Sequence, residues 1–332
     1  MARKNNSANY KVVIGLPARN EEVGIYDALR SIREAIRYAK ISAPIIVCLN
    51  GCTDRTGEVV KKFIRENKDV KCSIIRSRPG LVHAQGKIVE LFPADIYAFP
   101  DADGTISKDS LKLLLDEFKK NPKLIVAYAK TVSLLDGGRS IAKKIGLLYD
   151  SQKLLTPRHY IHGRFFATRE WYIPKDREVL SRAHKNRRNR KLLKYCKNKI
   201  LMSADDIFMS SYIVDKYGRS AIKQVDGAHC FAWPIASFGD WFNTYRRRNI
   251  ETAKMTRWFP EYNYLWPYLN RHTNWQKWFK TSSGDKILWL IFLLMKAIFY
   301  LRLKMEFLLL LINFYEPPEQ WKVTASTKKG IK

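Results

Sequence analysis

The stretch that organises this chain is Ile96-Tyr97-Ala98-Phe99-Pro100-Asp101-Ala102-Asp103-Gly104. Its first five residues are apolar and predict a buried strand, and two carboxylates one residue apart follow directly. Mg²⁺ in proteins takes one or two carboxylates and completes its octahedron with phosphate oxygens and water. Asp101 and Asp103 are therefore candidate ligands of a cation that holds a diphosphate. Because the same residue types also close ordinary surface turns, the surrounding sequence has to decide.

The first half of the chain alternates strand and helix patterns. Strands are predicted at residues 11–16, 44–49, 72–75 and 95–99, with apolar-striped helices between them. This alternation predicts a parallel sheet covered by helices, whose ligands lie beyond the carboxyl ends of the strands. Three polar clusters follow such ends: residues 17–21, 50–54 and 101–103. We expect them to meet at one edge of the sheet.

The second half is less regular. Residues 161–169 predict a strand in which Gly163 permits a ligand to approach closely. Residues 203–206, Ser-Ala-Asp-Asp, are expected to open a helix. Residues 221–232 predict a pair of short strands that contain His229, and residues 240–255 predict a helix with three consecutive arginines.

Composition narrows the class of ligand. Lys and Arg number 60 against 31 acidic residues, a net charge of +29, which favours phosphates, nucleic acid or an anionic membrane surface. The excess is densest at residues 175–199, either a solvated basic segment or an anionic contact. No GxGxxG motif occurs, and the P-loop-like residues 80–87 depart from that motif, which disfavours a dinucleotide enzyme or a kinase. Five cysteines without a CxxC pair indicate a reducing compartment, and no signal peptide is predicted.

Taken in order, five motifs resemble those of the family 2 inverting glycosyltransferases. They are Pro17-Ala18-Arg19-Asn20-Glu21-Glu22, Asn50-Gly51-Cys52-Thr53-Asp54, Asp101-Ala102-Asp103, Asp205-Asp206 and the arginines around Arg248. The resemblance covers roughly residues 10–256 and implies an α/β fold of the GT-A type, Rossmann-like, with a mostly parallel sheet covered by helices. It also implies a nucleotide-sugar donor, with a UDP-sugar favoured and a GDP-sugar possible, a divalent cation (Mg²⁺ or Mn²⁺), and inversion at the anomeric carbon. We place the catalytic domain at residues 1–256.

The resemblance assigns roles to individual residues. Asp206 is the expected general base, although Asp205 is an alternative and an acidic pair at that position also suits helix capping. Arg248, with Arg246 or Arg247, is expected to add charge against the diphosphate. Asp101 and Asp103 are the expected metal ligands, with His229 as a third ligand or else a core histidine. The expected donor-binding residues are Pro17, Ala18, Arg19, Glu21, Asn50, Lys87, Asp101 and Ala102, of which Lys87 is equally plausible as a surface lysine.

Two departures from the family pattern bear on specificity. Leu49-Asn50 stands where members often carry Asp-Asp. The Gln-x-x-Arg-Trp signature of processive members appears only as Tyr245-Arg246-Arg247-Arg248-Asn249. The second departure favours transfer of a single sugar over polysaccharide synthesis.

Residues 257–332 differ from the rest of the chain in amino-acid composition. Aromatic and basic residues alternate from Trp258 onward, as in the headgroup layer of a membrane. Residues 287–315 are then strongly apolar but contain Lys296, Arg302, Lys304 and Glu306, whereas a spanning helix needs about 20 apolar residues. Those charges fall within an arc of about 200° and leave one broad apolar side. This pattern predicts an amphipathic helix in the membrane interface, and the alternative is a helix that packs on the catalytic domain or on a second subunit.

Three functional interpretations follow. The leading one is a glycosyltransferase on the cytoplasmic side of a membrane, peripheral to an anionic surface, with a lipid-linked or membrane-proximal acceptor. The second keeps the chemistry but has a soluble acceptor, a cytoplasmic location and the C-terminal region as an oligomer interface. The third is a basic nucleic-acid-binding protein, which charge alone favours. No RNA-binding signature or zinc finger supports it, so we expect no nucleic-acid partner.

Overall fold

The computed structural model describes residues 10–135, 140–151, 154–155, 160–185, 192–193, 205–265 and 273–312. Most of the basic segment beyond residue 185 lies outside these ranges. So do Ser203 and Ala204 at the expected helix start, and residues 313–315 at the end of the apolar stretch.

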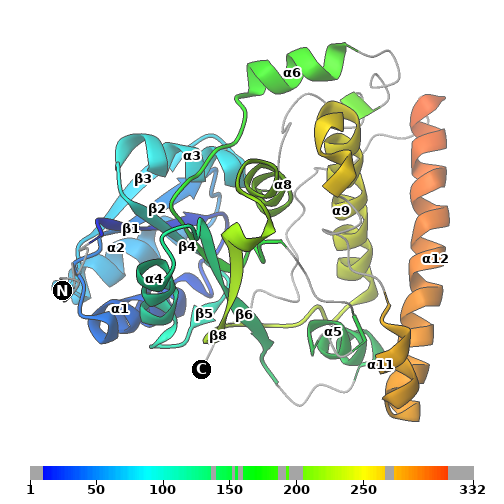
Figure 1. Ribbon diagram of the computed structural model, residues 1–332, viewed down its shortest axis with the longest axis horizontal. Coiled ribbons are helices and arrows are strands. Elements are labelled where there is room, and N and C mark those ends of the chain that lie inside the picture. Colours follow the sequence, from blue (N-terminus) through cyan, green and yellow to red (C-terminus); the bar gives the residue numbers. More distant parts are fainter. Residues whose placement is uncertain are drawn as a thin grey trace, which may run out of the picture.

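The described residues form one sheet of eight strands in the order β3-β2-β1-β4-β7-β6-β8-β5 (Figure 1). Four neighbouring strands are parallel, as the strand–helix alternation predicts, and β1 lies between β2 and β4. Their bounds are β1 (Val12–Ala18), β2 (Ile45–Asn50), β3 (Cys72–Ser77) and β4 (Ile96–Pro100). The remaining strands are β5 (Thr105–Ile106), β6 (Val126–Ser133), β7 (Phe165–Thr168) and β8 (Ile222–Ala232).

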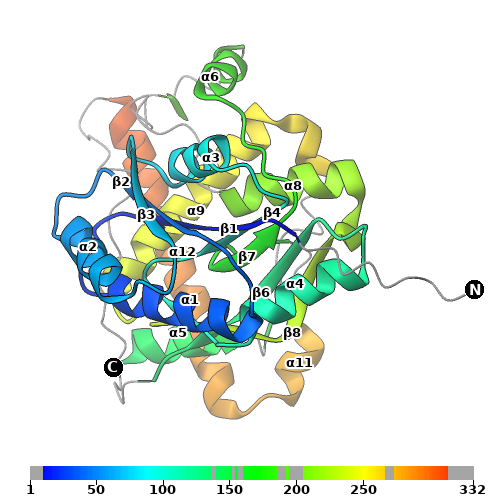
Figure 2. The same cartoon turned by 90° about the vertical axis from the view of Figure 1, so that its left-hand side faces the viewer.

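Helices cover both faces of this sheet, because successive residues of a buried strand point to opposite sides. Ile14 and Leu16 share a core with α1 (Ile25–Ala39), α2 (Thr56–Glu66) and α4 (Ser110–Lys120). Val13 and Phe99 share another core with α3 (Leu81–Leu91) and α8 (Asp205–Tyr217). Figure 2 shows α1 and α4 in front of the strands and α9 and α12 behind them.

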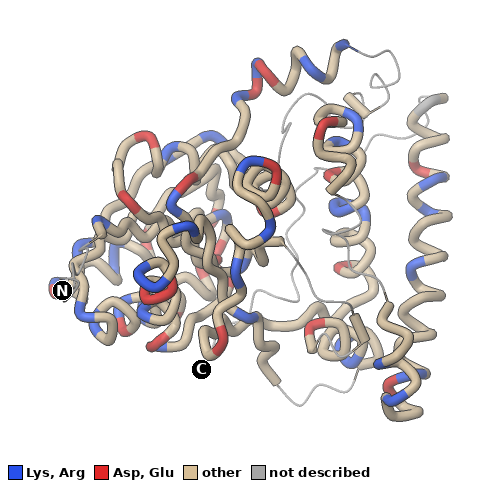
Figure 3. Tube along the Cα trace, in the orientation of Figure 1, with Lys and Arg blue, Asp and Glu red and all other residues tan. Residues whose placement is uncertain are grey.

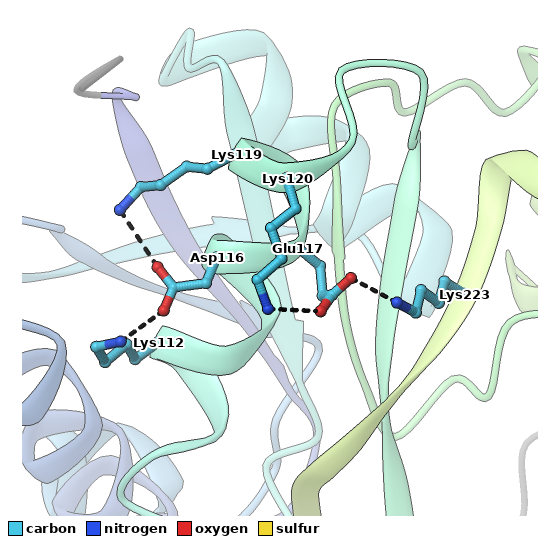
Figure 4. A network of polar contacts seen from close by, with 6 residues as sticks. All are labelled: Lys112, Asp116, Glu117, Lys119, Lys120 and Lys223. Carbon is cyan, nitrogen blue, oxygen red and sulfur yellow. Dashed lines mark hydrogen bonds and ion pairs between the residues drawn. The ribbon is translucent and has the colours of Figure 1, made fainter. Parts of the chain in front are cut away.

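The expected pair of short strands at residues 221–232 is wrong. The chain forms one long strand, β8, which runs parallel to β6 with a register shift and adopts φ +79° at Gly227. Asp-Gly at residues 226–227 is typical of a hairpin turn, but here it accommodates an irregularity within one strand. Ion pairs fasten α4 to this strand: Lys223 lies 2.6 Å from Glu117, which also pairs with Lys120 on its own helix (Figure 4).

Two long helices stand beside the sheet domain. They are α9 (Phe238–Trp258) and α12 (Ser283–Leu311), which lie side by side in Figure 1 with the shorter α5 (Ile141–Ser151) and α11 (Trp275–Lys280) near one end. One face of α12 packs on α5 and α9, so the packing alternative holds for that face. The buried side chains of this face are Trp289, Phe292, Met295, Phe299, Leu303, Glu306 and Leu310.

The other side of α12 is the predicted apolar side, and it is exposed. Its large exposed residues are Ile287, Leu290, Leu294, Ile298, Leu301, Met305 and Leu308. At about 100° per residue, Arg302 borders this stripe on one side and Lys304 on the other. Figure 3 shows how sparsely charged the helix is along its length. None of the helices in the described ranges has the length and uninterrupted apolar character needed to cross a membrane.

Candidate active site

The loops that follow β1 and β2 are fastened to each other by side-chain hydrogen bonds. Asn20, whose φ is +55°, accepts a hydrogen bond from the Thr53 amide at 2.8 Å and donates one to the Thr53 hydroxyl at 3.2 Å. The Glu21 amide donates to the Thr56 hydroxyl at 2.8 Å. Two of the predicted polar clusters, residues 17–21 and 50–54, therefore meet at one edge of the sheet, as expected.

Asn50 ends β2 at this edge and has an unusual environment. It is only 4% exposed, and its side-chain oxygen has no hydrogen-bond partner among the described residues. A buried carbonyl oxygen without a donor costs free energy, so a ligand N–H at this position would satisfy it. The nearby Asp54 helps to fix the loop. Burial opposes its charge, but hydrogen bonds from Thr56 and the Glu22 amide hold the pKa of this carboxyl below its usual value.

Asp101 and Asp103 lie at the end of β4, and a residue that the sequence did not single out stands beside them. Arg164 lies 3.8 Å from Asp103, and its backbone carbonyl accepts a hydrogen bond from the Asp101 amide at 2.8 Å. Burial opposes the charge of this guanidinium, but the carboxylates of Asp103, Asp101 and Asp150 outweigh it and raise its pKa. The only available sequence signal was its place beside Gly163 in a predicted strand.

Gly163 brings the predicted base to the same place. A Cβ atom at this glycine would lie 3.6 Å from a carboxylate oxygen of Asp206, which is ordinary contact distance. Asp206 thus lies against the residue preceding Arg164. Its other oxygen accepts the Ile207 amide at 2.9 Å in the first turn of α8. The side chain of Asp205 lies outside what the structure describes, so the choice between the two acids stays a prediction.

The three consecutive arginines of α9 reach three different places. Arg246 pairs with Glu306 of α12 at 3.8 Å. Arg248 donates a hydrogen bond to the Tyr149 hydroxyl of α5 at 2.7 Å. Tyr149 is the main cause of a raised pKa at Arg248, against the effect of burial.

Of the three arginines, Arg247 interacts electrostatically both with the predicted base, Asp206, and with Asp101 at the end of β4. Burial, and next the charge of Arg248, lower the pKa of Arg247. The carboxylates of Asp206, Glu251 and Asp101 act in the opposite direction. Asp206 also adds to the raised pKa of Arg248, so the predicted Arg248 is near the base although Tyr149 holds it. The sequence left open which arginine faces the site.

The expectation that His229 is a third metal ligand is wrong. All three proposed ligands lie within the described part of the chain, where no group of three His, Cys, Asp or Glu residues could hold a metal ion. Its neighbour Cys230 feels the charges of Arg164 and Asp101. Because successive strand residues point to opposite faces, the His229 ring lies on the other face, 6.4 Å from the ring of Phe231. The pKa of Cys230 is raised to about 11, chiefly by burial.

Asp101 and Asp103 alone still fit a cation that is shared with a ligand. Mg²⁺ commonly uses one or two protein carboxylates and takes the rest of its oxygens from phosphate and water. Arg164 supplies positive charge beside these carboxylates, 3.8 Å from Asp103. The donor set is therefore suited to a hard cation carried with a diphosphate, and the metal role of these two residues remains a prediction.

Lys87 is placed elsewhere. It lies exposed on α3 and lines a large cavity that Asp101, Asp103 and Asp206 do not line. Pro17 and Ala18 end β1 at the expected edge, beside the Asn50 loop, and Arg19 follows them. Their donor-binding roles, like that of Glu21, are predictions that nothing here tests.

The geometry described above can be set beside known families. Residues 13–173 match the family model for Glycosyl transferase family 2. This part of the chain, slightly less than half of it, is therefore similar to the family 2 glycosyltransferases. This span contains the residue 17–22, 50–54 and 101–103 motifs and Arg164, whereas Asp206 and the α9 arginines lie beyond it.

Individual relatives match only part of this chain, and the chain spans about a quarter or less of the length of the curated relatives it matches. The chondroitin synthase of Pasteurella multocida (strain Pm70) is 26% identical over 147 residues, which are 43% of this chain but 15% of that protein. The poly-beta-1,6-N-acetyl-D-glucosamine synthase of Staphylococcus epidermidis is 28% identical over 109 residues, 33% of this chain and 26% of the relative.

Among solved structures, a mannosyltransferase from Pyrobaculum calidifontis, in complex with GDP-Man and Mn²⁺, superposes with a TM-score of 0.50. It is 17% identical and covers 77% of this chain and 64% of the other. At that identity the likeness concerns the fold, and it confirms the predicted GT-A arrangement.

Proposed function

We propose that this protein is a metal-dependent inverting glycosyltransferase that moves one sugar from a nucleotide-sugar donor to a hydroxyl group of a lipid-linked or membrane-proximal acceptor. The observation that carries the proposal is that Arg164 lies 3.8 Å from Asp103 and holds the Asp101 amide through its carbonyl, while Asp206 lies against the neighbouring Gly163. Carboxylates and guanidinium groups at the end of parallel strands suit a donor diphosphate on one side and a proton acceptor on the other.

Each residue has a distinct task in this proposal. Asp101 and Asp103 would hold the divalent cation, Mg²⁺ or Mn²⁺, which would neutralise charge on the departing nucleoside diphosphate. Arg247 adds positive charge on the same side, and Arg164 keeps the two carboxylates in place. Asp206 takes the proton of the acceptor hydroxyl as that oxygen attacks the anomeric carbon from the face opposite the leaving group, as inversion by a single displacement requires. The Asn50 oxygen is available to a donor N–H group, a UDP-sugar being favoured and a GDP-sugar possible.

The membrane part of the proposal is supported by α12. One face of this helix is committed to the catalytic domain, while the exposed stripe from Ile287 to Leu308 is apolar and bordered by Arg302 and Lys304. A helix that lies in the interface buries such a stripe among acyl chains and places its cations at anionic headgroups. This supports a peripheral attachment to the cytoplasmic leaflet.

A donor-binding and turnover experiment tests the chemistry. Asp103→Ala should abolish transfer from UDP-sugars, and EDTA should do the same to the parent protein. Asp206→Asn keeps the shape of the base but cannot accept a proton, so turnover should fall by roughly 10²-fold or more while UDP still raises the melting temperature. Full activity in EDTA would refute the metal role, and normal turnover of Asp206→Asn with loss in Asp205→Asn would move the base to the neighbouring residue.

A liposome flotation experiment tests the membrane contact without disturbing the packed face of α12. The variant Leu290→Gln/Leu294→Gln/Leu301→Gln should no longer float with anionic liposomes. A matched control replaces three exposed apolar residues elsewhere, Leu91→Gln/Leu135→Gln/Ile141→Gln, and should float like the parent. If the stripe variant still floats, α12 is not the anchor. If the parent fails to float and is a dimer that the stripe variant converts to a monomer, the stripe is an oligomer interface.

A further inference from the structure

A large groove begins beyond the edge strand β3 and is separate from the carboxylates. It is bounded by α3, by α6 (Asp176–His184) and by the end of α9, and encloses about 1870 Å³. Ligand pockets are usually about 300–1,000 Å³, so this groove has room for an extended molecule. One end lies at Ser77, which pairs with Asn50 across the sheet. The basic groove, as we name this region, therefore starts next to the donor edge.

Its lining is dominated by cations that lack partners. Eight Lys and Arg side chains line the groove, against four carboxylates. Arg78 pairs with Asp176, and Arg182 pairs with Glu178 and Glu261. Within the described residues, the other six make no ion pair: Arg76, Lys87, Lys175, Arg177, Lys185 and Arg257. Like charges that face one concave surface repel each other and raise the local concentration of anions.

The groove also carries features that suit sugar rings. Trp171 packs against α3 so closely that a Cβ atom at Gly86 would lie 3.0 Å from its ring. Trp171 lines the groove and is part-buried, and its indole N–H has no acceptor among the described residues. Aromatic side chains with a polar handle offer an apolar face together with a hydrogen-bond donor. Glu90, which makes no ion pair within the described ranges, can accept a hydrogen bond from a hydroxyl group.

We propose that the basic groove binds an anionic oligosaccharide, a chain of sugars that bears carboxylate or phosphate groups. Arginine guanidinium groups match both anions with two parallel hydrogen bonds, so the two sources share one chemistry. A nucleic-acid backbone carries a charge at every nucleotide, whereas this lining places an aromatic ring and carboxylates among its cations, which suit the rings and hydroxyl groups of a sugar chain. A flat membrane surface cannot enter a concave groove. That the bound chain is the acceptor or the product rests on the function proposed above, whereas the binding itself does not.

A charge-reversal variant with a matched control tests the site. The groove variant Arg177→Glu/Lys185→Glu/Arg257→Glu changes three exposed cations that have no ion-pair partner. The control Lys61→Glu/Lys68→Glu/Lys123→Glu alters net charge equally at exposed positions outside the groove lining. Fluorescence anisotropy measures binding of labelled hexagalacturonate, of a phosphorylated hexamannoside and of neutral maltohexaose. Thermal melts show that both variants are folded.

The parent should bind one or both anionic hexasaccharides. Binding of hexagalacturonate identifies carboxylate as the recognised anion, and binding of the phosphorylated hexamannoside identifies phosphate. Maltohexaose should bind at least about tenfold more weakly. The groove variant should lose about 30-fold in affinity at low salt and the control less than about threefold, because exposed charges remote from the ligand are screened. Equal loss in the control, equal binding of maltohexaose, or tighter binding of a single-stranded oligonucleotide than of either anionic glycan would each overturn the inference.

A UDP titration of the same proteins separates this inference from the proposed function. The groove variant should bind UDP like the parent, because none of its three substitutions is in the donor site. If the parent binds UDP but neither anionic glycan, the inference fails and the proposed function stands. If it binds an anionic glycan through the groove but not UDP, the proposed function fails and the groove remains.

Discussion

An ion pair between Arg246 of α9 and Glu306 of α12 links the C-terminal helix to the rest of the structure. The two side chains are 8% and 7% exposed as residues, and their charged atoms lie 3.8 Å apart. At an effective dielectric constant of about 20 the gross attraction is about 4 kcal/mol. The cost of desolvating both charges cancels much of this attraction, so the net contribution of the pair to stability is small. Removal of one partner, however, leaves the other charge buried without its partner and without water.

We therefore expect the single substitutions to be costly and the double substitution to be mild. Glu306→Leu should reduce the free energy of unfolding by about 3 kcal/mol, which for a chain of this length corresponds to a melting temperature lower by roughly 4 °C. Arg246→Met should cost less, about 2 kcal/mol, because Arg302 remains 3.7 Å from Glu306 and is largely solvated. Arg246→Met/Glu306→Leu should lie within about 1.5 kcal/mol of the parent.

Differential scanning fluorimetry and urea unfolding measure all four proteins of this double-mutant cycle. The expected coupling free energy is about 2 kcal/mol or more. If the double variant loses as much stability as the two single variants together, the charges do not interact and the packing of α12 rests on its apolar face alone. Single variants that both melt like the parent would refute the burial argument itself.

Three further predictions concern the sheet domain. Gly104→Ala would place a Cβ atom 2.8 Å from the Phe231 carbonyl oxygen, so the turn that carries Asp103 should shift and transfer activity should fall about tenfold or more; Gly284→Ala, where nothing lies within 4 Å, is the control. Burial opposes the charge of Glu170, but hydrogen bonds from Lys216, Tyr212 and Tyr217 lower its pKa below the usual 4.5. Glu170→Gln should therefore cost about 1 kcal/mol at pH 7, and the difference in urea unfolding should shrink as the pH falls through the folded pKa; a constant difference would contradict this. Burial raises the pKa of Cys230 to about 11 and of Cys72 to about 12. In a Cys196→Ser background at pH 8, the part-buried Cys52 should therefore react with DTNB at least about tenfold faster than either. Mass spectrometry of the labelled protein measures which cysteine has reacted.

Much of the sheet was predictable because its signals are local. Buried runs such as residues 45–50 and 96–100 are continuous and end in polar clusters, and parallel strands must bring those ends to one edge. The long strand β8 was missed because Asp226-Gly227 has the composition of a turn, and only pairing with β6 decides otherwise. Long-range pairing of this kind leaves no mark on a single sequence.

The positions of the site motifs along the chain could be predicted from the sequence. The directions in which individual side chains point could not. Asp101 and Asp103 follow β4, and Asp206 lies in the first turn of α8 against Gly163, while the roles of these residues stay predictions. Arg164 was missed because nothing in its local sequence separates it from a solvated arginine. His229 was misplaced because the face that a strand residue occupies depends on register, and register in turn depends on the irregularity near Gly227. For α12, the apolar stripe could be found by helical geometry, but its packed face needed the partner helices.

The three arginines of α9 give this helix a fixed phase. Each successive residue turns by about 100°, and this turn sends Arg246 to α12, Arg247 toward the carboxylates and Arg248 to α5. Insertion or deletion of one residue between the start of α9 and Tyr245 would rotate the three arginines about the helix axis by about 100°. Each arginine side chain would then point where its neighbour points now. Substitutions along this segment can be absorbed one at a time, but a change in its length cannot. Length variation in homologous chains should therefore be confined to the loops on either side of α9, and the interval between Phe238 and Arg246 should be constant wherever the triplet is kept.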